Sequence, residues 1–169
     1  MTGGDYALVR SVEAFEDHEA FGRRQVDEQG LGAGDVLVAI SEGGETSSVI
    51  GTAWRALERG ATVFFVCNNP LDVLAEHVER SRRVIDEDAI TKLDLSTGPM
   101  ALAGSTRMQA TTMELLVVGA ALDEAIRCRV GRGADAPEPA AGFRQLLASL
   151  GSPEGLAALA NMVALEAAV

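Results

Sequence analysis

The chain has 169 residues, of which 47% are hydrophobic and 23% are charged, and its formal net charge is −11. This length is enough for one domain with a real core, and the acidic balance, with no basic cluster beyond residues 80–83, argues against a nucleic-acid-binding protein. No run of about 18 apolar residues occurs, so we expect no membrane association and a cytoplasmic protein in which Cys67 and Cys128 remain reduced.

The first half of the chain alternates helical patterns with short apolar runs. We expect helices over residues 5–15, 16–28 and 47–59 and strands over residues 36–40 and 62–67. Both strands are continuous apolar runs, as parallel strands buried on both faces are. The order of strand, helix and strand is typical of a right-handed βαβ unit, so we expect the two strands to be adjacent and parallel.

The second half predicts more helix and less sheet. We expect helices over residues 71–80, 104–126, 143–150 and 153–168, a short third strand over residues 83–86, and irregular chain over residues 87–99. The fold class is therefore α/β, a three-layer sandwich with a parallel sheet, and the domain comprises residues 1–130. A linker over residues 131–142 leads to the C-terminal helices, whose apolar surface should pack on something.

The loop after the first apolar run has the composition of an anion-binding turn. Its polar residues and glycines stand between a buried strand and a helix, and they are Ser41, Gly43, Gly44, Thr46 and Ser47. In parallel sheets, ligands bind at the carboxyl ends of the strands, and a helix N-terminus there favours an anion. The same loop also carries Glu42 and Glu45, whose charges oppose an anion.

Four local patterns identify a family resemblance. They are the Gly3–Ala7 segment with Val12–Asp17, the strand and loop over residues 36–46, the turn Val66-Cys67-Asn68 with Pro70, and the sequence Gly104-Ser105-Thr106-Arg107-Met108. Together they resemble the sugar isomerase (SIS) domain, most closely the N-acetylmuramic acid 6-phosphate etherases and the related glucokinase regulatory protein. The resemblance covers about residues 3–127 and implies a flavodoxin-like or Rossmann-like sheet that lacks its first strand unit.

The resemblance implies a substrate class and a chemistry. The ligand would be a phosphorylated amino sugar, and the reaction would eliminate lactate from its ether with one base and one acid. Of the two glutamates that the family uses, the second matches Glu16, which we expect to be half-buried at a helix junction; the segment that would carry the first precedes this sequence. Asn68, Ser105 and Thr106 join the loop residues as expected substrate contacts, and no metal ion or cofactor is implied.

The sequence also departs from the family pattern at the loop. Gly43 stands where the family has serine and Glu45 where it has arginine, so side-chain contributions to phosphate binding are weakened while the backbone donors remain. Three hypotheses stay open: a lyase or sugar-phosphate isomerase, a module that senses a phosphosugar without turning it over, and a fragment or half-domain of a larger protein. A sheet without its first strand exposes an edge, so we expect a homodimer or a higher homo-oligomer.

Overall fold

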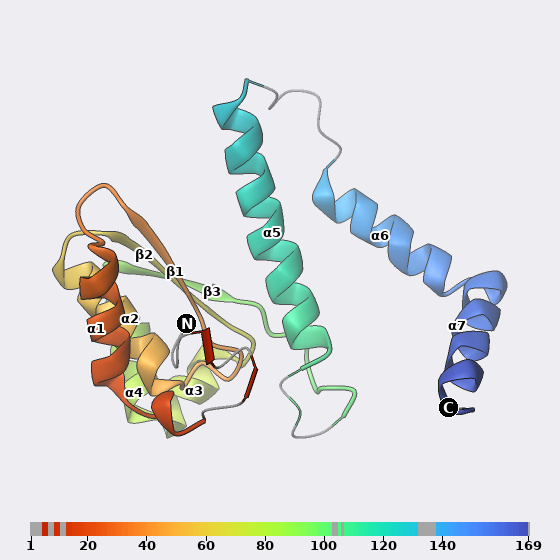
Figure 1. Cartoon of the computed structure of the whole chain (residues 1–169), viewed down its shortest axis with the longest axis horizontal. Helices are drawn as coiled ribbons and strands as arrows, with labels where there is room; N and C mark the ends of the chain where they lie inside the picture. Colours follow the sequence, from red (N-terminus) through yellow and green to blue (C-terminus); the bar gives the residue numbers. More distant parts are fainter. Residues whose placement is uncertain are drawn as a thin grey trace. The chain divides into compact units, whose positions relative to one another are not determined.

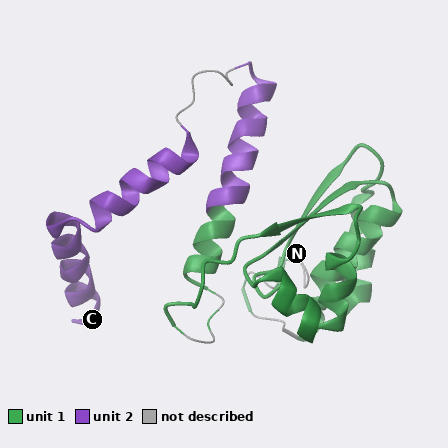
Figure 2. Ribbon diagram, turned by 180° about the vertical axis from the view of Figure 1, so that it is seen from behind, with its two compact units in different colours: residues 1–115 green, residues 116–169 purple. Residues whose placement is uncertain are grey.

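The computed structural model describes residues 5–6, 9–10, 13–102, 105, 107–131 and 138–168 (Figure 1). Its helices are η2 (Glu13–Phe15), α1 (Glu19–Gln29), α2 (Ser47–Glu58), α3 (Leu71–His77), α4 (Glu79–Ile85), α5 (Gln109–Arg129), α6 (Pro139–Leu150) and α7 (Pro153–Glu166). The chain divides into two compact units, residues 1–115 and 116–169, with the division inside α5 (Figure 2).

Unit 1 is an α/β domain built on a three-stranded parallel sheet. The strands β1 (Val36–Ile40), β2 (Thr62–Cys67) and β3 (Ile90–Asp94) lie in the order β1-β2-β3. Each pair is parallel, with Val36 opposite Thr62 and Val63 opposite Ile90. The predicted pairing of the first two strands is therefore confirmed, and the α/β class with it.

Several elements and boundaries predicted from the sequence are wrong; the helix expected over 71–80 is two helices, α3 and α4, and α6 begins at Pro139, inside the expected linker. The segment expected as a third strand is the end of α4, because Ser81, Val84 and Ile85 follow a helical period and the first two are buried. The third strand instead lies at 90–94, inside the stretch expected to be irregular. The long helix begins at Gln109 rather than at 104, since Met108 has a left-handed backbone (φ 71°) that a right-handed helix cannot contain.

The core of unit 1 lies between the sheet and the helices that cover one of its faces. Alternate residues of the strands point into it, and its largest fully buried side chains are Phe65, Ile50, Ile90, Val26 and Val63. Fully burying side chains of this size stabilises a fold by about 1.5–3 kcal/mol each. This core fixes the strand positions and hence the positions of the loops at their carboxyl ends.

Helices α1 and α2 pack against each other at two glycines. A Cβ atom on Gly22 would lie 2.8 Å from the Ser48 carbonyl carbon, and one on Gly51 would lie 2.9 Å from the Glu19 carbonyl carbon. Apolar carbon atoms are normally about 3.5–4.0 Å apart. The two backbones therefore approach more closely than any residue with a side chain would permit.

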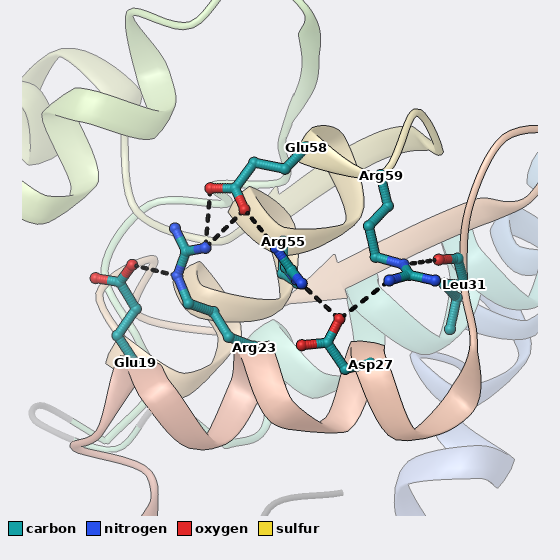
Figure 3. A network of polar contacts seen from close by, with 7 residues as sticks. All are labelled: Glu19, Arg23, Asp27, Leu31, Arg55, Glu58 and Arg59. Carbon is teal, nitrogen blue, oxygen red and sulfur yellow. Dashed lines mark hydrogen bonds and ion pairs between the residues drawn. The ribbon is translucent and has the colours of Figure 1, made fainter.

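A network of ion pairs links α1 and α2 on the exposed side of this helix pair (Figure 3). Arg23 bonds Glu19 of its own helix and, at 2.8 Å, Glu58 of α2, while Arg55 of α2 bonds Asp27 of α1 at 2.8 Å. Hydrogen bonds from these arginines lower the pKa values of Glu58 and Asp27. The network fixes the register of α1 on α2, although each exposed pair contributes little stability by itself.

Apolar side chains are also exposed on both units. In β1, which pairs only with β2 among the described residues, Val36 is 59% exposed and Val38 and Ile40 are each 38% exposed. Helices α6 and α7 have no buried residues within the described part of unit 2. Among the described helices, none combines the length and the apolar composition that crossing a membrane requires.

Candidate functional site

The carboxyl ends of the strands hold two loops side by side. The Ser41 N–H donates to the Val66 carbonyl at 3.0 Å, and the Asn68 N–H donates to the Glu42 carbonyl at 3.0 Å. The β1–α2 loop and the turn after β2 thus continue the pairing of their strands. This edge of the sheet is the place where a parallel α/β fold binds ligands.

The β1–α2 loop forms the predicted tight turn at the start of a helix. The Gly44 N–H donates to the Ser41 carbonyl at 2.8 Å, and α2 begins at Ser47. Gly44 has a φ of 76°, and a Cβ atom there would lie 2.5 Å from a Leu74 methyl group, so only glycine fits. The Ser81 hydroxyl donates to the Gly44 carbonyl at 2.8 Å and holds the turn from α4.

Part of the hydrogen-bonding capacity of this loop is already used within the protein. The buried Ser41 hydroxyl lies 3.0 Å from the Thr46 hydroxyl and accepts the Thr46 N–H at 3.3 Å. The Ser48 N–H donates to the Glu16 carbonyl at 2.8 Å. Among the described residues, the N–H groups of Gly43 and Ser47 have no acceptor, which leaves these donors for a ligand.

Glu45, which replaces the expected arginine, has an arginine beside it. Arg80 of α4 lies 3.4 Å from the Glu45 carboxylate and also donates to the Glu45 carbonyl at 2.5 Å. Both side chains are about half exposed. The negative charge that Glu45 brings to the loop is therefore partly neutralised by a residue distant in sequence.

Glu16 lies next to the start of α2, but its environment differs from the expected one. Its carbonyl accepts the Ser48 N–H, which places its backbone beside the loop. The residue is exposed, so the expectation of a half-buried carboxylate is wrong. Glu16 lies in the turn between η2 and α1, which accounts for its exposure.

Two polar residues of α5 that were not predicted, Thr111 and Glu114, join Asn68 and Glu42 at this edge. Thr111 of α5 donates its hydroxyl to the Glu42 carboxylate at 2.7 Å. The Asn68 amide donates at 3.3 Å to the carbonyls of Leu95 and Ala110, which joins the turn after β2 to the first turn of α5. The next turn of this helix carries Glu114, which is 9% exposed.

Glu114 and Asn68 each have a buried oxygen that lacks a hydrogen-bond partner in the part of the chain that the structure describes. These oxygens are Glu114 Oε1 and Asn68 Oδ1. Burial, together with the charge of Glu42, raises the pKa of Glu114 to about 7. Burial and the nearby charges of Asp94 and Glu114 raise the pKa of the Cys67 thiol to about 11, so this cysteine is not a nucleophile.

The remaining predicted substrate contacts are Asn68, Ser105 and Thr106, and of these only Asn68 is placed at this edge of the sheet by its contacts. Asn68 lies in the group just described, whereas Ser105 is half-buried and its N–H donates to the Leu102 carbonyl at 3.1 Å. Thr106 lies outside the described residues. Gln109, the first residue of α5, holds the preceding loop by bonds to Pro99 and Ala101. The described residues contain no group of three or more His, Cys, Asp or Glu side chains that could hold a metal ion.

The fold and this edge define an α/β protein with a glycine-rich loop at the carboxyl end of a parallel sheet. No protein-family model matches the chain. Its sequence is homologous to proteins named N-acetylmuramic acid 6-phosphate etherase, which supports the family resemblance drawn from its motifs. The SIS assignment itself stays a prediction.

Three of these relatives show the extent of the match. The etherase 1 of Bacillus licheniformis is 32% identical over 118 residues, which are 70% of this chain and 35% of the relative. The etherase of Deinococcus radiodurans is 33% identical over 78% of this chain and 39% of its own length, and that of Thermosynechococcus vestitus is 41% identical over 66% and 33%. The chain thus spans between a third and two fifths of these relatives.

Proposed function

We propose that the chain is an SIS-type phosphosugar-binding unit related to the etherases, which acts in the elimination of lactate from a phosphorylated amino sugar. The observation that carries this proposal is the homology to the etherases across both loops of the carboxyl edge. The turn at the start of α2 supports it, because the backbone donors of Gly43 and Ser47 and the positive end of the helix dipole suit a phosphate.

The ligand contacts in this proposal divide into three roles. Ser41, Gly44 and Thr46 shape the loop through the hydrogen bonds described above. Gly43 and Ser47 meet the phosphate, the former by its N–H and the latter by its N–H and hydroxyl. Asn68, Ser105 and Thr106 belong to the sugar side of the same proposal.

Glu16 is the proposed catalytic group. Elimination removes a proton from the carbon beside the sugar aldehyde and breaks the carbon–oxygen bond to lactate, so it needs a base and an acid. The exposed position of Glu16 beside the start of α2 leaves its carboxylate accessible to a sugar held by the loop. A module that binds the phosphosugar without cleaving it is the second candidate, which the replacement of an arginine by Glu45 favours.

Calorimetric titration with N-acetylmuramic acid 6-phosphate and N-acetylglucosamine 6-phosphate tests the binding proposal. Ser47→Ala should weaken binding about tenfold through loss of one hydroxyl donor to a charged group. The matched control is Ser149→Ala, which removes an exposed serine hydroxyl from α6 and should leave binding unchanged. Binding of neither sugar phosphate, or equal binding by both variants, would refute the proposal.

The release of lactate separates the two candidate functions. If the chain is a lyase, it releases lactate from N-acetylmuramic acid 6-phosphate. Glu16→Gln then abolishes lactate release while the affinity for the sugar phosphate is retained. If the chain is a sensing module, it binds the sugar phosphate and releases no lactate. The comparison between Glu16→Gln and its neighbour Asp17→Asn, which is also exposed, distinguishes a catalytic role from a general effect of charge.

Self-association is also part of the proposal. The exposed valines of β1, Val36 and Val38, and its outer edge offer surface and backbone groups that a second copy would cover. Light scattering at micromolar concentration should give a mass of at least two chains, and Val38→Lys should shift it toward one. A monomeric mass without aggregation would contradict this part.

A further inference from the structure

The side chains of Asn68 and Glu114 both carry a buried polar atom whose hydrogen bonds are incomplete. Asn68 is 3% exposed and Glu114 is 9% exposed. Neither Asn68 Oδ1 nor Glu114 Oε1 has a hydrogen-bond partner among the described residues. Because an unpaired polar atom in the interior loses its bonds to water without replacement, each such atom requires an explanation. Two of them indicate that a ligand completes their hydrogen bonds.

The contacts of Asn68 with α5 place these two residues at the same junction. The Asn68 amide nitrogen donates at 3.3 Å to the Ala110 carbonyl, and Ala110 is four residues before Glu114 in α5. Residues four apart on a helix share one face. The same nitrogen also donates to the Leu95 carbonyl. The atom that Asn68 leaves for a ligand is therefore its acceptor, the amide oxygen.

Glu114 supplies a donor beside this acceptor. Burial and the charge of Glu42 raise the pKa of Glu114 to about 7, so its carboxyl is protonated in about half of the molecules at pH 7 and in most at pH 6. Glu42, the negative neighbour in the β1–α2 loop, accepts the Thr111 hydroxyl at 2.7 Å. The pKa of Cys67 is raised to about 11, so this neighbouring thiol stays neutral in the same range. A protonated Glu114 has one O–H to donate.

One acceptor and one donor from two elements select the kind of group that fits. An ionised carboxylate or phosphate has no proton for Asn68 Oδ1, and Glu42 repels it. An ammonium has donors only and leaves the Glu114 O–H unused. A hydroxyl would have to serve both residues through a single oxygen atom. A secondary amide offers its N–H and its carbonyl on separate atoms, and because it is neutral, its burial leaves no charge uncompensated.

We propose that Asn68 and Glu114 recognise the acetamido group of an N-acetylated amino sugar, with Asn68 Oδ1 accepting its N–H and the Glu114 carboxyl donating to its carbonyl. The two residues thereby determine specificity for the substituent on the sugar nitrogen. The inference rests on the proposed function for the choice of sugar, and it deepens that function by naming the residues that distinguish an N-acetylated sugar from others. The phosphate loop is not needed for this recognition.

Sugars that differ only at carbon 2 test the inference apart from the phosphate. N-acetylglucosamine, glucosamine and glucose are titrated into the whole chain at pH 6 and followed by NMR chemical-shift changes. N-acetylglucosamine should bind at least about tenfold more tightly than the other two, because only its acetamido group satisfies both residues. Its affinity should be about tenfold lower at pH 8, since the protonated fraction of Glu114 falls by about that factor across a pKa of about 7.

Substitutions at Glu114 separate the donated proton from a structural role. Glu114→Gln retains an N–H donor, so it should keep the preference for N-acetylglucosamine and lose the dependence on pH. Glu114→Met has a similar length and no donor, so it should bind N-acetylglucosamine about tenfold more weakly while its affinity for glucose stays unchanged. The matched control is Glu124→Met, which makes the same replacement at an exposed position of α5 and should change neither affinity.

The comparison of the three sugars uses the unaltered protein, so it stands even if a variant fails to fold. Equal binding of N-acetylglucosamine and glucose, which is expected if Glu114 donates its proton to Asn68 within the protein, would overturn the inference. So would the absence of N-acetylglucosamine binding at millimolar concentration. If N-acetylglucosamine is preferred but its 6-phosphate binds no more tightly, the acetamido site stands and the proposed phosphate loop fails. If the 6-phosphates of N-acetylglucosamine and glucose bind equally, the loop stands and the inference fails.

Discussion

Replacing Gly51 by alanine should destabilise unit 1, although alanine is the better helix former. The added Cβ would lie 2.9 Å from the Glu19 carbonyl carbon and closer still to its oxygen. Restoring a normal separation of about 3.5–4.0 Å requires α1 to move away by about 1 Å. That movement stretches the bonds of Arg23 to Glu58 and of Ser48 to Glu16, both now 2.8 Å long.

Overpacking of this kind costs about 1–3 kcal/mol, against a gain of about 1 kcal/mol in helix propensity. Because the added Cβ meets backbone rather than a flexible side chain, the cost should lie near the upper end of this range, and we expect a net loss of about 2 kcal/mol in the free energy of unfolding. Chemical denaturation followed by the fluorescence of Trp54, which lies on α2, measures it directly. The control is Gly119→Ala in α5, where a Cβ meets nothing within 4 Å and stability should rise. A Gly51→Ala protein as stable as the parent would refute the close packing of α1 on α2.

Three further outcomes are expected. Because burial beside Glu42 raises the pKa of Glu114 from 4.5 to about 7, the folded state holds a proton that the unfolded state has lost between these pH values. The parent should therefore lose up to about 3 kcal/mol of stability relative to Glu114→Gln as pH rises from about 4.5 to 7, measured by denaturation at each pH. A thiol reagent at pH 8 should modify the exposed Cys128 much faster than the buried Cys67, whose modification should follow unfolding. Glu45→Arg should fail to tighten a sugar phosphate unless Arg80 is changed with it.

The sequence was most informative where an apolar run of strand length was continuous, although β1 is more exposed than a strand buried on both faces would be. The strands β1 and β2 were predicted correctly because each is an unbroken apolar run at the centre of a βαβ unit. The strand β3 was missed because it is an edge strand among the described residues, with only Ile90 and Leu93 apolar in five positions. The segment predicted as the third strand, residues 83–86, is instead the end of α4. The adjacent pair Val84 and Ile85 shows no helical period by itself, and the period becomes clear only when Ser81 is included.

The candidate site divides in the same way. The turn over residues 41–47 was predictable because its glycines and hydroxyls are local to one loop. The group of Glu42, Asn68 and Glu114 was not, because three elements distant in sequence bring it together. Glu114 was the available signal, since it is a charged residue within the apolar stretch of α5, but helical periodicity alone does not say what a helix faces.

The pair of Glu45 and Arg80 changes what a single substitution at the loop would do. An arginine at position 45 alone would place two guanidinium groups where an ion pair of 3.4 Å now stands, and Arg80 would lose its carboxylate partner. The double variant Glu45→Arg/Arg80→Glu keeps the pair and reverses its direction, so that the positive charge lies in the loop. We expect this variant, and not Glu45→Arg alone, to bind N-acetylglucosamine 6-phosphate about tenfold more tightly in calorimetric titration. The single variant Arg80→Glu supplies the control, because it adds negative charge beside the loop and should weaken binding. Equal affinities of all three variants and the parent would mean that the phosphate lies away from this loop.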